Sequence, residues 1–153
     1  MRSIKRFFQV NFLISFFTIC SVAFAENYSQ LEANKKIAIK FLEAVANEHS
    51  FEKAAQYLGP HYIQHNPTAQ DGIAGLKQYI QFLHDKRPQH RNKIFQVIAE
   101  GNYVVLHVLS TNTPQDRGAA VFDMFRFEHG KIVEHWDVQQ DIPDHPANRN
   151  SMF

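Results

Sequence analysis

AAVFDMFRFEHGKIVEHWDVQ, residues Ala119–Gln139, is the stretch from which the rest of the chain can be interpreted. It contains two apolar-rich, β-favouring runs joined by the short polar link EHGK, residues 128–131. A glycine inside such a link is a hairpin signal, so we expect two antiparallel strands. The hairpin places Asp123, a carboxylate, close to Trp136, the only tryptophan of the chain.

The turn fixes which side chains of the hairpin share a face, because side chains alternate across a strand. We expect Phe127 to face Ile132, so that Asp123 faces Trp136. One face then carries Asp123, Phe125, Glu134 and Trp136, and the other carries Phe122, Met124, His135 and Asp137. A slip of one residue is expected to exchange the partners and keep one aspartate on each face.

The first 25 residues have the features of a secretory signal peptide. A basic start precedes an apolar run from Phe12 to Cys20, and Ala23-Phe24-Ala25 fits the small-x-small cleavage rule. The apolar run is too short to span a membrane comfortably. We therefore expect cleavage after Ala25, one domain over residues 26–153, and a bacterial protein of the periplasm or the exterior.

Removing this segment changes the charge and the cysteine content. It carries three of the 16 lysines and arginines and none of the 15 acidic residues, which leaves 13 basic against 15 acidic residues. It also carries the only cysteine, Cys20, so the mature chain has no disulfide and no thiol chemistry. A near-neutral balance gives no electrostatic reason to bind nucleic acid or a membrane surface. The expected partner is a small molecule.

The sequence of the mature chain predicts helices followed by strands. Helices are expected over 28–47, 51–58 with Ser50 as N-cap, and 71–86, with an irregular segment at 61–67. Strands are expected over 94–99, 103–111, 119–127 and 131–139. This order predicts an α+β fold, in which N-terminal helices pack on one face of an antiparallel sheet and leave a pocket between them.

Three stretches resemble the SnoaL-like polyketide cyclase family, a branch of the nuclear-transport-factor-2-like or ketosteroid-isomerase-like superfamily. They are YIQHNP at 62–67, the segment from Asp71-Gly72 to Gly75-Leu76, and the hairpin at 122–137. The resemblance implies a cone-like α+β barrel with a curved sheet around a pocket. It implies a pocket aspartate that closes a ring by aldol chemistry without metal or cofactor. It also implies a homodimer through the outer sheet face, where Phe122 and Met124 would supply apolar surface.

Asp123 is the first candidate for this acid–base, because an aromatic pocket disfavours its charged form. The alternative is an outward-facing aspartate paired with Arg126 or Lys131. Asp137 is the reserve candidate, since the predicted register puts it on the opposite face and the hairpins of the resembled family end in a similar Trp-Asp.

Six further residues are candidates for the site. His107 lies in an otherwise apolar strand, so it must be hydrogen-bonded in the core or line the pocket, where it could take part in catalysis. His65 and Asn66 could bind a substrate carbonyl or orient water, or could merely form and cap a turn. Phe125 and Trp136 are expected as apolar walls, and Tyr62 as a further substrate-binding residue.

The nine histidines do not predict a metal site. His61 and His65 alone have the i, i+4 spacing of a helical ligand pair, and Pro60 and Pro67 leave little room for a helix there. No nucleophile elbow, Walker loop or dinucleotide fingerprint is present. Two functions remain open: a cofactor-free lyase or isomerase acting on a small, largely apolar carbonyl compound, or a non-catalytic exported protein that binds a small hydrophobic ligand.

Overall fold

The computed structural model describes residues 28–153, so the expected signal peptide lies outside the described residues. A helix over 28–42 continues into the π-helical turn η1 (Glu43–Asn47). The elements after it are α2 (Phe51–Ala55), β1 (Leu58–Gln64), α3 (Gly72–Lys86), β2 (Arg91–Glu100), β3 (Tyr103–Thr111), β4 (Ala119–Glu128) and β5 (Lys131–Asp141). Within residues 28–153, no helix combines the length and the apolar character needed to cross a membrane.

Helices α2 and α3 each begin at a residue whose side chain caps the helix. The Ser50 side chain accepts a hydrogen bond from the Lys53 amide and begins α2, as predicted. Asp71 Oδ1 accepts one from the Gly72 amide at 2.8 Å and begins α3. The same oxygen accepts the Gln64 amide at 2.8 Å, so this cap also fastens the end of β1 to α3.

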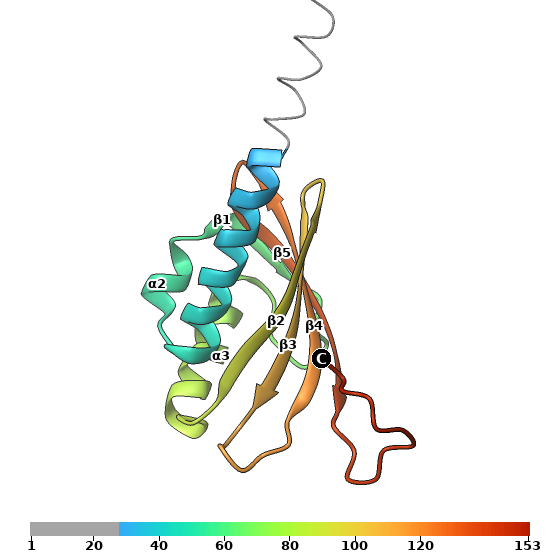
Figure 1. Ribbon diagram of the computed structural model, residues 1–153. Helices are drawn as coiled ribbons and strands as arrows, with labels where there is room; N and C mark the ends of the chain where they lie inside the picture. Colours follow the sequence, from blue (N-terminus) through green and yellow to red (C-terminus); the bar gives the residue numbers. More distant parts are fainter. Residues whose placement is uncertain (1–27) are drawn as a thin grey trace, which may run out of the picture.

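The sheet has five strands in the order β1-β5-β4-β3-β2, with the helices on one side of it (Figure 1). Strands β2 to β5 are antiparallel neighbours, as predicted, and β1 pairs in parallel with β5. The irregular segment expected at 61–67 therefore lies partly in an edge strand. The close approach needs Gly59, because a Cβ at that position would lie 2.7 Å from Val133 Cγ1.

The β4–β5 hairpin contains a one-residue bulge. Its turn residues His129 and Gly130 both have positive φ, 49° and 72°, as a two-residue primed turn requires. Phe127 pairs with Ile132, as predicted, but the next pair is Arg126 with Glu134. Val133 is thus an extra residue on β5. Beyond the bulge the predicted register is wrong by one residue.

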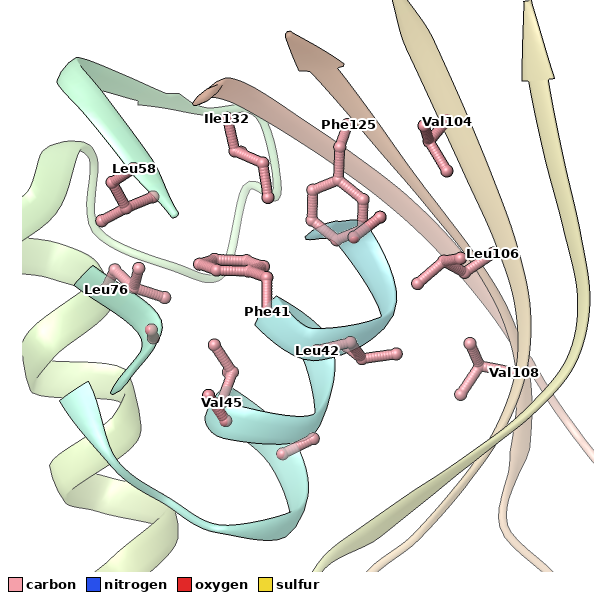
Figure 2. Close-up of a cluster of buried hydrophobic side chains, with 14 of the residues drawn as sticks. Phe41, Leu42, Val45, Leu58, Leu76, Val104, Leu106, Val108, Phe125 and Ile132 are labelled. Atoms are coloured by element: carbon pink, nitrogen blue, oxygen red, sulfur yellow. The ribbon is translucent and has the colours of Figure 1, made fainter. Parts of the chain in front are cut away.

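The hydrophobic core lies between the first helix and the inner face of the sheet (Figure 2). Leu42 on the helix points toward Leu106 and Val108 of the sheet, and Val45 in η1 lies on the side of α3 and Leu76 (Figure 2). The Phe41 and Phe125 rings meet edge to face with centroids 5.5 Å apart. Burying a side chain of this size stabilises the fold by roughly 1.5–3 kcal/mol. This contact also holds the first helix over β4, where the candidate site begins.

Candidate active site

A cavity of about 280 Å³ lies between the inner face of the sheet and the helices. Its apolar lining comes mainly from the first helix, η1, α3 and β4, and includes Phe41, Leu42, Val45, Leu76 and Phe125. Its polar lining gathers at the end of β1 and on the β4–β5 hairpin, and includes Tyr62, Gln64, Asn66, Asp123, His135 and Asp137. The cavity therefore combines an apolar body with one concentrated group of titratable side chains.

Both hairpin aspartates lie on the cavity side. Asp123 pairs directly with Asp137 across the strands, and such partners project from the same face. The expectation of one aspartate on each face is therefore wrong, because the Val133 bulge moves Asp137 to the inner face and Trp136 to the outer one. Asp123 is buried, with 6% of its surface exposed, and it pairs with neither Arg126 nor Lys131.

His135 connects Asp123 to the end of β1. Its Nε2 lies 3.1 Å from Asp123 Oδ1, and its Nδ1 lies 2.9 Å from Gln64 Oε1. The Gln64 oxygen also accepts the Asn66 backbone amide at 2.9 Å, which fixes the orientation of the Gln64 side chain. Since Oε1 can only accept, Nδ1 of His135 must carry a proton.

A second proton must lie between His135 and Asp123. A bare Nε2 and a carboxylate oxygen are both acceptors, so a hydrogen bond between them requires a proton on one of them. This proton belongs to the pair, whichever atom holds it. It leaves Asp123 Oδ2 as a buried oxygen with no hydrogen-bond partner among the described residues.

Asp137 is held by Asn66. The Asn66 amide nitrogen donates to both carboxylate oxygens, at 2.7 Å and 2.8 Å. The Asn66 oxygen in turn accepts the amide and the hydroxyl of Thr68, at 2.8 Å and 2.7 Å. The sequence analysis left open whether Asn66 only forms a turn. It does both: it shapes the turn after β1 and lines the cavity against Asp137.

Tyr62 lies in the same group with 4% of its surface exposed. Its hydroxyl oxygen accepts a hydrogen bond from the Gln64 amide nitrogen at 3.3 Å. Burial raises the pKa of the Tyr62 phenol above its usual range, and the carboxylates of Asp123 and Asp137 raise it further. The phenol therefore stays protonated and keeps a proton to donate.

His65 and Trp136, both expected in the pocket, lie instead on the outer face of the sheet. Their rings stack with centroids 4.5 Å apart and nearly parallel. His65 Nε2 also lies 2.7 Å from Glu134 Oε1, and the other Glu134 oxygen accepts from Arg126. The bulge again explains the difference, because it turns Glu134 and Trp136 outward together. Neither His65 nor Trp136 lines the cavity.

His107 is buried, with 8% of its surface exposed, but it does not line the cavity. Its ring stacks on Phe122 at 4.3 Å, on the outer face of the sheet. The ring of Phe153 covers it at 5.2 Å, because the segment after β5 returns to the sheet. The alternative of a pocket position is therefore wrong, whereas His107 is buried as the other alternative required, between aromatic rings on the outer face.

Three side chains of the group could hold a metal ion. One ligand atom each from Asp123, His135 and Asp137 lies within 4.8 Å of the others. Carboxylate oxygen and imidazole nitrogen are ligands for zinc and other divalent ions. In the structure, however, protein hydrogen bonds occupy Nε2 of His135 and both oxygens of Asp137. The proton shared by His135 and Asp123 and the Asn66 amide that binds Asp137 can therefore hold these three groups in place.

His135 and Gln64 are the site residues that sequence reasoning missed. The alternation rule did place His135 and Asp137 on one face of β5. The missing fact was the bulge, which brings that face to the cavity and sets both residues beside Asp123. Gln64 lies in YIQHNP, from which the sequence analysis selected Tyr62, His65 and Asn66 as candidates for the site but not Gln64.

Comparisons with known proteins agree with this architecture. Residues 38–135 match the family model described as a SnoaL-like domain. No curated protein sequence matches the chain. Three similar solved structures indicate the nuclear-transport-factor-2-like fold. They establish the fold alone, because all three are less than 25% identical to this chain.

The similar structures come from different bacteria. TsrD from Streptomyces laurentii is 22% identical, with a TM-score of 0.58 over 71% of this chain and 88% of its own. A proposed polyketide cyclase from Bacillus cereus is 21% identical, with a TM-score of 0.60 over 70% of this chain and 74% of its own. A proposed ketosteroid isomerase from Kribbella flavida is 15% identical, with a TM-score of 0.60 over 80% and 89%.

Proposed function

Because the chain belongs to the SnoaL-like family, we propose that it is a cofactor-free lyase or isomerase that moves a proton on a small, largely apolar carbonyl compound. The observation that carries the proposal is Asp123 Oδ2, a buried carboxylate oxygen with no partner among residues 28–153, in a cavity lined by both apolar and polar side chains. No donor in that part of the chain engages this oxygen, so it is available to accept a proton from a ligand.

The proposed first step is removal of a proton from the carbon next to the substrate carbonyl. Asp123 Oδ2 takes this proton, and the electron pair of the carbon–hydrogen bond moves toward the carbonyl oxygen. Tyr62 donates a hydrogen bond to that oxygen as its negative charge grows. His135 stabilises Asp123 through the shared proton at Oδ1.

The second step returns the proton. In an isomerisation the enolate takes it back at a different carbon. In an aldol-type closure the enolate carbon first attacks a second carbonyl of the same molecule, and the new alkoxide takes the proton. Asp123 can supply it directly. Asp137 is the second candidate, since Asn66 holds it on the same side of the cavity.

Deuterium exchange tests this proposal without knowledge of the natural substrate. The small apolar ketone 2-tetralone has acidic hydrogens next to its carbonyl, and proton NMR in D₂O follows their replacement. The protein should accelerate exchange, and Asp123→Asn should lower the rate by about 10²- to 10⁴-fold. Glu134→Gln is the matched control, because it makes the same change on the outer face and should leave the rate unchanged.

Two outcomes would overturn this proposal. Exchange by Asp123→Asn at the wild-type rate would remove Asp123 as the acid–base. Tight binding of 2-tetralone by the wild-type protein without any exchange would favour the other function, a ligand-binding protein without catalysis.

We also propose that the protein acts after export to the periplasm or the exterior. The basic start, the short apolar run and the Ala-x-Ala motif support this location. N-terminal sequencing of the exported protein should begin at Glu26. A sequence that begins at Met1 would contradict the proposal.

A further inference from the structure

The cavity has a second polar end, away from Asp123, at the start of β2. Asn92 lines it there, on the strand position paired with Ser110, which pairs in turn with Ala119. Asp123 lies four residues further along β4 than Ala119. At a rise of about 3.3 Å per residue, the two ends are roughly 13 Å apart along the strands. The cavity is therefore elongated.

Asn92 Oδ1 is a buried acceptor without a hydrogen-bond partner. Within residues 28–153, two buried side-chain atoms lack a partner, and the other is Asp123 Oδ2. Both residues line the same cavity. Buried polar atoms in folded proteins nearly always have a partner, so an unpaired one calls for an explanation, such as a reactive role or a water or ligand group that completes it. Because both atoms belong to residues of one cavity, a single ligand with two polar groups can complete both.

The backbone of Asn92 explains why its side chain is free. The Asn47 side chain accepts the Asn92 amide at 2.7 Å and donates to the Asn92 carbonyl at 2.9 Å. This bridge fixes β2 to η1 and satisfies the backbone of Asn92 completely. The side-chain oxygen of Asn92 is therefore not used by this bridge, and Asn92 is one of the residues that line the cavity.

We infer that the cavity binds an elongated apolar compound with a hydroxyl group at each end, one donating to Asp123 Oδ2 and the other to Asn92 Oδ1. The Asp123 end rests on the proposed function, in which Asp123 Oδ2 faces the reacting part of the substrate; the Asn92 end does not. Phe41, Leu42 and Val45 supply apolar lining for the body of the ligand.

Arg87 is consistent with a hydroxyl rather than a carboxylate at the Asn92 end. It lines the same cavity, donates to Asn112 Oδ1 at 3.1 Å and lies over the Phe82 ring. A hydroxyl can donate to Asn92 and accept from Arg87 at once. A carboxylate has no proton to donate and would face the Asn92 oxygen with a like partial charge.

Matched pairs of aromatic alcohols test the inference by calorimetry. The short pair is 2-naphthol and 2,6-dihydroxynaphthalene; the long pair is 4-phenylphenol and 4,4′-dihydroxybiphenyl. In at least one pair, the second hydroxyl should raise the affinity of the wild-type protein by about tenfold, the expected gain from pairing a buried acceptor. The methyl ether of that second hydroxyl accepts but cannot donate, and should lose the gain.

Asn92→Leu should remove the gain while leaving the affinity for the single alcohol unchanged. Asn92→Ala removes the same oxygen without adding bulk, and serves if the leucine variant does not fold. The inference is overturned if neither diol binds, if neither binds more tightly than its single alcohol, if the methyl ether binds equally well, or if the gain survives in the Asn92 variant. Asn92 takes no part in the proposed proton transfer. The calorimetric affinities therefore test the Asn92 end of the ligand even if the protein does not accelerate exchange of 2-tetralone.

Discussion

The two faces of the β4–β5 hairpin each carry a carboxylate–histidine pair, but in different surroundings. On the inner face, Asp123 and His135 are 3.1 Å apart and buried. On the outer face, Glu134 and His65 are 2.7 Å apart, and 39% of the His65 side chain is exposed. Arg126 takes the second oxygen of Glu134, whereas the second oxygen of Asp123 has no partner.

This difference is the reason for which we propose a structural role for the outer pair and a reactive role for the inner pair. On the outer face both carboxylate oxygens are occupied and a permanent cation neutralises the charge. On the inner face one carboxylate oxygen has no partner among residues 28–153, and the other shares a proton with His135. The residue types are nearly the same, so their surroundings, rather than their identity, decide the chemistry.

The largest difference in exchange rate is expected between a variant of His135 and a variant of His65. His135→Gln removes the group that shares the proton with Asp123, so exchange of 2-tetralone should fall by about 10²-fold. His65→Gln, the matched change on the outer face, should leave the exchange rate unchanged. An equal loss in both variants would show that the two faces are not functionally distinct.

Gln64→Leu sharpens the comparison on the inner face. It removes the acceptor that holds the Nδ1 proton of His135, so the exchange rate should fall by about tenfold, the value of one hydrogen bond to a charged group. Nitrogen-15 NMR should show Nδ1 of His135 protonated in the wild-type protein and a changed protonation pattern in the variant. Gln64→Glu restores an acceptor and should recover the wild-type protonation of the His135 ring. If Gln64→Leu keeps the wild-type protonation of His135, Gln64 has no positioning role.

If two copies of the protein associate through the outer face of the sheet, that face becomes buried. The difference in exposure between the inner and the outer carboxylate–histidine pair then becomes smaller. We propose a homodimer there, because Phe122 and its cross-strand neighbour Val138 are 44% and 69% exposed. Light scattering at roughly micromolar concentration, the range of a specific dimer, should give twice the mass of the chain, and Val138→Lys should give the mass of one chain. A monomeric wild-type protein would contradict the proposal.

The smallest effect is expected from the outer pair alone. Burial acts to raise the pKa of Glu134, but hydrogen bonds from Arg126 and His65 outweigh it and leave this pKa below its ordinary value of 4.5. Glu134 therefore stabilises the folded state above that value, and the contribution is lost as the pH falls through the folded-state pKa. For a network at the protein surface, in which 39% of the His65 side chain is exposed, it amounts to about 1 kcal/mol or less.

Thermal unfolding measures this contribution. The difference in melting temperature between the wild-type protein and Glu134→Gln should be largest near neutral pH and should shrink in acid. A difference that stays constant from neutral pH to well below 4.5 would show that the ionised Glu134 is not responsible.

The sequence predicted most of the fold because its signals are local. Ser50 and Asp71 begin helices at the expected positions, and the glycine in the EHGK link marks the hairpin turn. Strand β1 was the exception. Its pairing with β5 depends on contacts between distant residues, and a proline such as Pro60 is tolerated in a sheet mainly at an edge strand, which local patterns do not reveal.

The candidate site was predicted in part, and one residue explains most of what was not. Counting by alternation fails after Val133, since a bulge reverses the faces of every later residue. Asp123, Phe125, Tyr62 and Asn66 line the cavity as expected, because none of them depends on the register of β5. Trp136 and His135 exchanged faces. His107 faces outward by simple alternation between the inward Leu106 and Val108, and it is covered there because Phe153 returns to the sheet.

The parallel pairing of β1 with β5 has a consequence for how the protein folds. Gln64 and Asn66 meet His135 and Asp137 across sequence separations of 71 residues. Closing a segment of that length loses chain entropy before any contact compensates for it, and pairings of high contact order form slowly. The antiparallel strands, joined by short turns, can assemble first, and β1 then docks at the edge. Ligand binding should therefore recover in the slowest refolding phase, later than the bulk of the secondary structure.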